Sequence, residues 1–283
     1  MSPTLLLKNA LVIATMDDEQ REIANGSVFI RGNRVEAVGP ASELPDTADK
    51  VIDMTGHVLI PGLINTHHHM FQSLTRALPA AQDAELFDWL TALFPVWQNI
   101  SPAMQRAATR TAMAELMLSG CTTAADHAYL YVNGTRLDDS VQAAQEMGMR
   151  FHAVRGAMSL GQSKGGLPPD ALVEQDEDAI LKEMQRVVEE LHDATPDAMI
   201  KVALGPCSPF TVTTDLMREG AALARSYGVG LHTHTAENAK DLAFSKERYG
   251  MTPTEYTESV GWVGADVWHA HCVHLDDPGI ALF

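Results

Sequence analysis

The chain has 283 residues, of which 46% are hydrophobic and 20% are charged. Its formal net charge is -17 at neutral pH, which argues against nucleic acid or an anionic membrane surface as a partner. We expect a small neutral or cationic substrate instead. No apolar run reaches the ~18 residues that a membrane-spanning helix needs.

The cysteines are few and scattered. Cys121, Cys207 and Cys272 form no pattern of a disulfide framework. The N-terminus lacks the basic start and the small-residue cleavage site of a signal peptide. We therefore expect a cytoplasmic protein.

Residues 4 to about 57 show short β-rich runs separated by turn signals. These signals are Asn9-Ala10, Asn25-Gly26 and Gly32-Asn33, each between runs that are rich in Val, Ile and Leu. The segment contains no cluster of titratable residues. We predict a small β-module with a structural role.

From residue 58 onward, strand patterns alternate with amphipathic helix patterns. We expect strands at 121–127, 150–158, 200–204, 230–234 and 267–271, and helices at 101–120, 138–148, 178–193, 214–227 and 239–260. Strands that alternate with helices predict parallel βαβ units, here those of an α/β (β/α)₈ barrel. Only six units can be counted before residue 283, so the sequence looks truncated after the sixth strand.

The first β-rich stretch of this region ends in three consecutive histidines. Side chains alternate between the two faces of a strand, so His67 and His69 share a face and His68 points to the other. Two imidazoles on one face at a strand end can supply two ligands to a transition metal. A polar turn that is merely rich in histidine is the alternative for this stretch alone.

A second His-x-His lies at the end of a later strand. Glu237 follows His234 by three residues, which brings an imidazole and a carboxylate within reach of one site. Such a carboxylate can move a proton to and from a metal-bound water. His232 could replace His234 as the ligand, but His234 is nearer the carboxyl end of the strand and is favoured. His271 ends the sixth strand, so a third histidine cluster lies at a third strand end.

Other polar residues also lie at the carboxyl ends of predicted strands. His127, Arg155 and Cys207 are the examples, and this end of a (β/α)₈ barrel carries the active site. We include His127 and Arg155 as candidates for the substrate pocket on their position alone, with a structural role as the alternative for each.

Three motifs together resemble the amidohydrolase superfamily, in its nucleobase and triazine aminohydrolase branch. They are Pro-Gly-x-x-Asn-x-His-x-His at 61–69, His-x-x-Glu at 234–237 and Ala-His-Cys-x-His at 270–274. The similarity extends beyond these motifs along nearly the whole chain. It implies an amidohydrolase barrel at 58–283 and, at 1–57, the N-terminal part of a composite β-sandwich domain.

The resemblance also implies a metal centre. By this resemblance, His67, His69 and His234 would bind one divalent metal, zinc, with iron as the alternative. Glu237 is the implied proton shuttle between the attacking water and the substrate ring.

The same resemblance implies a substrate and its contacts. His271 would hold or polarise the attacking hydroxide, Gln72 would contact a purine, and Cys207 is similarly placed to line the ring pocket. The expected substrate is an oxidised purine, 8-oxoguanine, whose 2-amino group is replaced by oxygen as ammonia leaves. Isocytosine and guanine are alternative substrates. Since the superfamily often forms oligomers, a homo-oligomer is a further expectation.

One departure from the superfamily pattern leaves alternatives open. The superfamily takes a further ligand and base, an Asp, from the end of the eighth strand, and this sequence stops before such a strand. We therefore expect an open barrel edge with exposed apolar surface. A triazine-type hydrolase that expels chloride or an alkylamine is the first alternative, and a metal-binding protein without activity is the second.

Overall fold

The computed structural model describes residues 2–283 and contains two compact units, Met1–Leu63 and Ile64–Phe283. The first unit is a sheet with the strand order β3-β2-β1-β4, in which β5 also pairs with β1. Its strands are β1 (Thr4–Ala14), β2 (Glu22–Arg31), β3 (Arg34–Pro40), β4 (Lys50–Asp53) and β5 (Val58–Leu59). Ala10, Ile13 and Val28 form the buried core of this unit.

Two of the predicted turns in this unit are wrong. Asn9 and Asn25 lie inside β1 and β2, with φ of 64° and 51° respectively, and the chain continues as a strand on both sides. The register of β1 against β2 shifts between Leu7 and Ala10, which is the mark of a β-bulge. Asparagine tolerates the left-handed conformation that such a bulge requires, so the same residue fits a bulge as well as a turn. The predicted turn at Gly32-Asn33 is confirmed, because β2 and β3 form an antiparallel hairpin around it.

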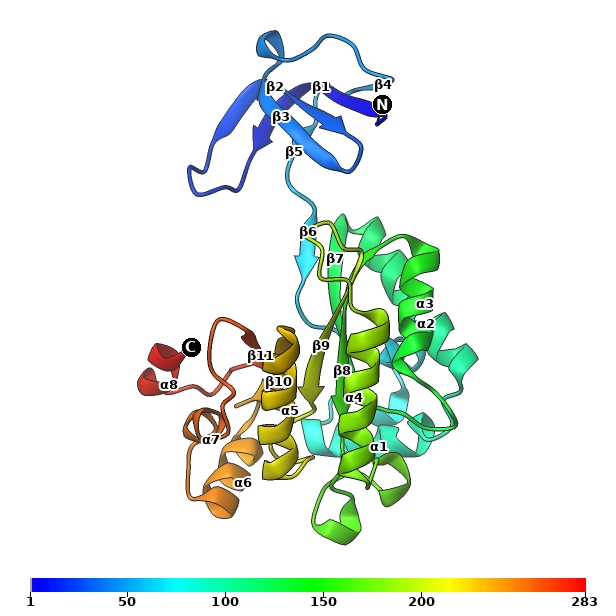
Figure 1. Ribbon diagram of the computed structural model, residues 1–283, viewed down its shortest axis with the longest axis vertical. Helices are drawn as coiled ribbons and strands as arrows, with labels where there is room; N and C mark the ends of the chain where they lie inside the picture. The colour runs from blue at the N-terminus through cyan, green and yellow to red at the C-terminus, as the bar shows by residue number, and fades with distance from the viewer. Residues whose placement is uncertain (1) are drawn as a thin grey trace. The chain divides into compact units, whose positions relative to one another are not determined.

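The second unit is a curled parallel sheet of six strands with helices packed on it (Figure 1). The strand order follows the chain, from β6 at one edge to β11 at the other. This order confirms the predicted α/β barrel architecture with six βα units. The strands are β6 (Leu63–Asn65), β7 (Cys121–Ala128), β8 (Arg150–Ala157), β9 (Ile200–Pro206), β10 (Gly230–Thr235) and β11 (Val267–His271).

The helices begin and end at local signals in the sequence. The Ser101 side chain caps α2 by accepting a hydrogen bond from the Met104 N–H, and Pro102 occupies the first helical turn. The predicted helix at 239–260 is two helices, because Gly250 ends the first with φ of 72° and Thr252 caps the second. The helices are α1 (Leu86–Trp97), α2 (Pro102–Leu118), α3 (Leu137–Met147), α4 (Glu177–Leu191), α5 (Thr214–Tyr227), α6 (Ala239–Tyr249), α7 (Pro253–Ser259) and α8 (Asp277–Leu282).

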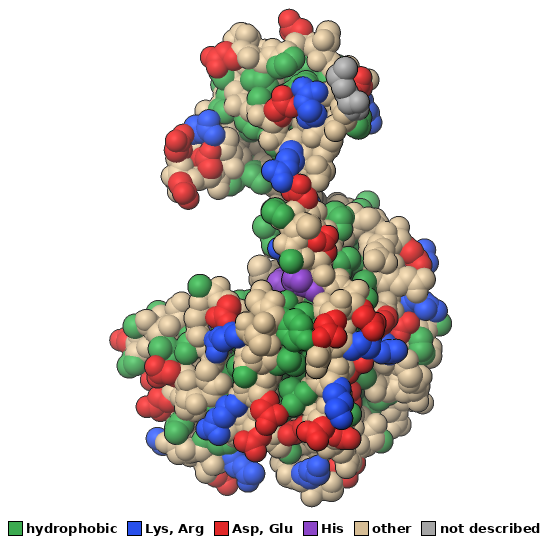
Figure 2. Space-filling model, in the orientation of Figure 1, with side chains coloured by type: hydrophobic (Ala, Val, Ile, Leu, Met, Phe, Trp, Pro, Cys, Tyr) green, Lys and Arg blue, Asp and Glu red, His purple; other side chains and the backbone are tan. Residues whose placement is uncertain are grey.

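Within residues 2–283, no helix is both long and apolar enough to cross a membrane. On the face of the second unit that Figure 2 shows, acidic and basic side chains are interspersed.

The interior of the sheet depends on a glycine in β9. A Cβ on Gly205 would lie 2.4 Å from the His232 carbonyl oxygen and 2.8 Å from Nε2 of His127. We expect Gly205→Ala to lower the free energy of unfolding by about 2 kcal/mol or more, because a backbone atom cannot move aside. Urea denaturation measures this. Gly220→Ala in α5 is the control, since its Cβ would meet nothing closer than 3.5 Å and alanine favours a helix. Equal stability of the two variants would contradict the packing argument.

Candidate active site

One pocket of about 170 Å³ lies at the carboxyl ends of the parallel strands. Its wall is mainly aromatic and aliphatic, and much of it comes from α1 and from the loops that follow β8 and β9. Six of the nine site residues that we predicted from the sequence line this pocket, namely His69, Gln72, Cys207, His234, Glu237 and His271. An apolar slot with a few convergent polar groups is typical of a site for a small planar ligand.

Three imidazoles converge beside this pocket. One ring nitrogen from each of His67, His69 and His234 lies within 4.8 Å of the others. Nε2 of His69 is 3.0 Å from Nε2 of His234. His67 and His69 come from the segment that follows β6, whereas His234 is in β10, so the fold brings them together across 165 residues.

Backbone carbonyls fix the tautomers of His69 and His234. Nδ1 of His69 lies 2.7 Å from the His127 carbonyl oxygen, and Nδ1 of His234 lies 2.6 Å from the Cys207 carbonyl oxygen. A carbonyl can only accept a hydrogen bond, so each Nδ1 carries the proton. Both Nε2 atoms therefore present bare lone pairs to each other at 3.0 Å. Two such lone pairs repel unless a cation lies between them.

A relay through His232 fixes the tautomer of His67 in the same way. Nδ1 of His232 is 2.7 Å from the Trp268 carbonyl oxygen and must donate to it. Nε2 of His232 then accepts from Nδ1 of His67, 2.7 Å away. The remaining nitrogen, Nε2 of His67, is buried and has no hydrogen-bond partner. His232 thus orients His67 and has both of its own nitrogens occupied.

This arrangement fits a transition metal. Three unprotonated Nε2 atoms face a common point, and each ring is held from behind by an oxygen or nitrogen acceptor, as is usual for histidine ligands. Burial lowers the pKa of His67 to about 4 and those of His69 and His234 well below their ordinary value. The rings are therefore neutral at pH 7, which is the form that binds a metal.

Glu237 and His271 lie together next to the histidine cluster, with the His271 ring stacked 5.2 Å from that of His234. Oε1 of Glu237 is 3.5 Å from Nε2 of His271. Burial and the neighbouring Asp241 carboxylate raise the pKa of Glu237 to about 7. A carboxyl group with a pKa near neutrality can both take up and release a proton during turnover.

Gln72, Tyr129 and Cys207 also line the pocket. The Gln72 amide donates to the hydroxyl oxygen of Tyr129 over 3.1 Å, and the Tyr129 ring packs 5.0 Å from that of His69. Cys207 is buried, which raises the pKa of its thiol. Tyr129 was missed from the sequence because it follows β7 in an apolar run, Ala128 to Leu130, that carries no motif.

The described residues that line the pocket include neither Arg155 nor His127. Gly156 faces the His127 ring inside the sheet, so its neighbour Arg155 points to the opposite face and binds Glu174. His127 is fully buried beneath the histidine cluster, with its ring 4.9 Å from that of His234. Its visible contribution is the backbone carbonyl that holds His69.

Comparisons with known proteins identify relatives of this chain among the curated deaminases and aminohydrolases. The 8-oxoguanine deaminase of Pseudomonas aeruginosa is 42% identical over 272 residues, which cover 95% of this chain and 60% of the relative. The hydroxydechloroatrazine ethylaminohydrolase of Pseudomonas sp. (strain ADP) is 36% identical over 265 residues, which cover 88% of this chain and 54% of the relative. The chain thus spans little more than half the length of these curated relatives.

Solved structures show the same fold. A triazine hydrolase from Arthrobacter aurescens superposes with a TM-score of 0.93 at 32% identity, over 99% of this chain and 63% of that one. An atrazine chlorohydrolase from Arthrobacter aurescens TC1, complexed with zinc, superposes with a TM-score of 0.92 at 31% identity, with the same coverage. The model of the amidohydrolase family matches residues 58–282, which include the histidine cluster and Glu237. The chain therefore belongs to the amidohydrolase family.

Proposed function

We propose that the protein is a zinc-dependent hydrolytic deaminase of an oxidised purine, with 8-oxoguanine as its substrate. One observation carries the proposal: three bare Nε2 atoms converge beside a carboxyl group of raised pKa, in a slot with aromatic walls. The name of the 42%-identical relative supports the choice of substrate. The zinc complex of a structural neighbour supports the choice of metal.

His67, His69 and His234 would hold the metal, which supplies a polarised water as nucleophile at neutral pH. Glu237 accepts a proton from the attacking water and delivers it to a ring nitrogen next to the carbon that bears the amino group. His271, 3.5 Å from Glu237, holds the attacking oxygen in place. The C–O bond forms, the C–N bond breaks, and the amino group leaves as ammonia after a second proton transfer.

The pocket wall would orient the flat substrate. Trp89, Phe94 and Phe210 supply aromatic surface for a planar ring. Gln72, held by Tyr129, offers its amide to the polar edge of the purine. The thiol of Cys207 stays neutral at pH 7 because burial raises its pKa, so it contributes contact rather than charge.

A triazine hydrolase is the second candidate. The solved structures that superpose with TM-scores of 0.92 and 0.93 are triazine hydrolases, and the same nucleophile can displace chloride or an alkylamine from a triazine ring. The metal centre is the same in both candidates, so only the substrate distinguishes them.

The deciding experiment is ammonia release, with the protein expressed from its gene to the natural stop codon and loaded with zinc. We expect release from 8-oxoguanine. Isocytosine, guanine and a chlorotriazine are run in parallel, and metal content is measured on the same sample. Turnover of the triazine alone would move the assignment to the second candidate. A folded protein with bound metal and no turnover of any ring would refute both.

A further inference from the structure

The segment between β8 and α4 is a compact loop whose two ends meet. The Glu174 N–H donates to the Met158 carbonyl oxygen over 2.9 Å, which joins the ends of residues 159–173. Inside the loop, the Gly166 N–H donates to the Gly161 carbonyl oxygen, and Asp170 accepts from both the N–H and the hydroxyl of Ser163. The segment therefore has the closed ends and internal hydrogen bonds of an Ω-loop.

This loop supplies one wall of the pocket. Leu167 and Pro168 line the pocket, together with Met158 at the foot of the loop. The loop after β9 supplies a neighbouring part of the wall, including Phe210 and Thr211. The Ser159 and Leu160 N–H groups both donate to the Thr211 carbonyl oxygen, over 2.9 and 3.0 Å, so the two loops are joined at their bases.

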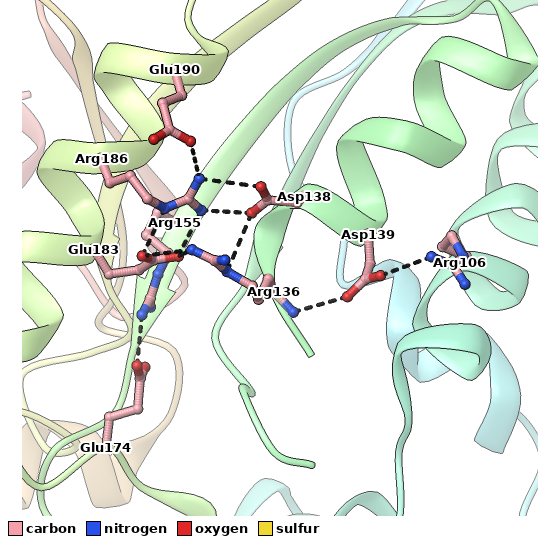
Figure 3. Close-up of polar contacts among 9 residues, drawn as sticks. All are labelled: Arg106, Arg136, Asp138, Asp139, Arg155, Glu174, Glu183, Arg186 and Glu190. Carbon is pink, nitrogen blue, oxygen red and sulfur yellow. Dashed lines mark hydrogen bonds and ion pairs between the residues drawn. The ribbon is translucent and has the colours of Figure 1, made fainter. Parts of the chain in front are cut away.

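An ion pair between the buried Arg155 and the partly exposed Glu174 holds the far end of the loop. Nη2 of Arg155 lies 2.7 Å from Oε1 of Glu174, and the Arg155 side chain is only 1% exposed (Figure 3). The guanidinium is itself held in place, because it lies 3.8 Å from the ring centroid of Tyr131 and donates to the Gly156 carbonyl oxygen. A rigid buried cation at the end of β8 thus fixes the position of a carboxylate on the loop.

A second carboxylate supports the near end. Glu177, in the first turn of α4, accepts hydrogen bonds from the hydroxyls of Ser159 and Thr213. These contacts fix the start of the loop to the α5 cap, whereas the Glu174 side chain, at the other end of the loop, is held by Arg155. The ion pair with Arg155 is thus the side-chain contact that fixes Glu174 at the end of the 159–173 loop.

We propose that Arg155 is a positioning residue, which acts through Glu174 to hold the Leu167–Pro168 wall against the bound ring. Its effect on substrate binding rests on the proposed function, whereas its effect on the loop does not. Arg155 is neither among the residues that line the pocket nor among the three converging histidines, so we expect loss of the pair to raise KM and to leave kcat within about two-fold.

Limited trypsin digestion tests the anchor without substrate. Lys164 is exposed in the loop, and cleavage after it yields one fragment that ends at Lys164 and one that begins at Gly165, which mass spectrometry identifies. We expect Glu174→Gln to speed this cut about ten-fold, because a charge-assisted hydrogen bond is lost. Glu183→Gln is the matched control. Glu183 pairs with Arg186 at 2.7 Å and with Arg136 at 3.2 Å, both outside residues 159–173, and its side chain is 25% exposed against 29% for Glu174.

The second readout is the split between KM and kcat. We expect Glu174→Gln to raise KM for 8-oxoguanine about five- to ten-fold, and Glu183→Gln to leave it unchanged. Glu174→Asp keeps the charge beside Arg155 but shortens its reach, so it covers the case in which the unpaired cation impairs folding. We expect Glu174→Asp, like Glu174→Gln, to speed the trypsin cut and to raise KM.

Each adverse outcome points to a distinct error. A Glu174→Gln variant cut no faster than the Glu183→Gln control would overturn the anchor. A faster cut with an unchanged KM would overturn the positioning role. A wild-type protein that turns over no purine would remove the proposed substrate, while the digestion would still decide the anchor.

Discussion

Glu237→Gln is expected to lower kcat for ammonia release about 1,000-fold while the metal content stays at the wild-type level. The amide has nearly the same shape as the carboxyl group but cannot take up a proton, and positioned acid–base groups typically contribute 10²–10⁴-fold. The expected metal ligands are the three converging histidines, and Glu237 is not among them, so the variant should keep its metal. Steady-state ammonia release and metal analysis on the same preparation measure the two quantities.

The role of Glu237 as proton shuttle also predicts how activity depends on pH. Burial and the nearby Asp241 raise the pKa of Glu237 to about 7, so the group is increasingly protonated below neutrality. The shuttle must start as a carboxylate, and a bound cation would lower its pKa. We therefore expect kcat/KM to fall on the acid side, with an apparent pKa at or below 7.

Asp241→Asn is the matched control for this prediction. Asp241 accepts a hydrogen bond from the Glu237 N–H over 3.1 Å, but it does not line the pocket. Removing its negative charge should move the acid limb to lower pH and keep most of the activity. If Glu237→Gln kept the wild-type rate, another group would have to carry the proton.

The second large effect separates His234 from His232. We expect His234→Ala to abolish stoichiometric zinc binding and activity, because it removes one of three convergent Nε2 atoms. His232→Ala should weaken zinc affinity about 10–100-fold, since it removes only the acceptor that orients His67. Titration of the metal-free protein with zinc against a chelator of known affinity measures both.

A conservative variant sharpens this comparison. His232→Gln can still accept from Nδ1 of His67 through its side-chain oxygen, so part of the lost affinity should return. His234→Gln has no comparable way to restore an imidazole ligand. If His232→Ala lost zinc as completely as His234→Ala, His232 would be the ligand and the tautomer argument would be wrong.

The sequence predicted which residues lie at this site better than it predicted which of their atoms contact one another. The ring nitrogens of His67 and His69 converge as expected, but both residues follow β6, which ends at Asn65, so a strand face is not what brings them together. The spacing from His234 placed Glu237 at the same pocket. Periodicity could not choose between His232 and His234, because residues two apart in a strand share a face. The choice depends on the Trp268 carbonyl, which reaches His232 from the neighbouring strand.

The misplaced candidate and the missed elements have equally specific causes. Arg155 was selected for its position at a strand end, but the side chain one residue before Gly156 points to the other face of the sheet. Helix α1, which supplies Trp89 and Phe94 to the pocket, was not predicted from the sequence.

The sequence by itself determined the alternation of strands and helices, the six parallel strands and most of the side chains at their carboxyl ends. These follow from periodicity and from local caps, which act between residues close together in the chain. Only the tertiary structure decided which imidazole nitrogens are bare, which side chains form the aromatic wall, and that Arg155 binds Glu174. Those depend on atoms of residues that are not neighbours in the sequence, 19 residues apart for Arg155 and Glu174 and 165 for His67 and His232, and that meet only in the folded chain.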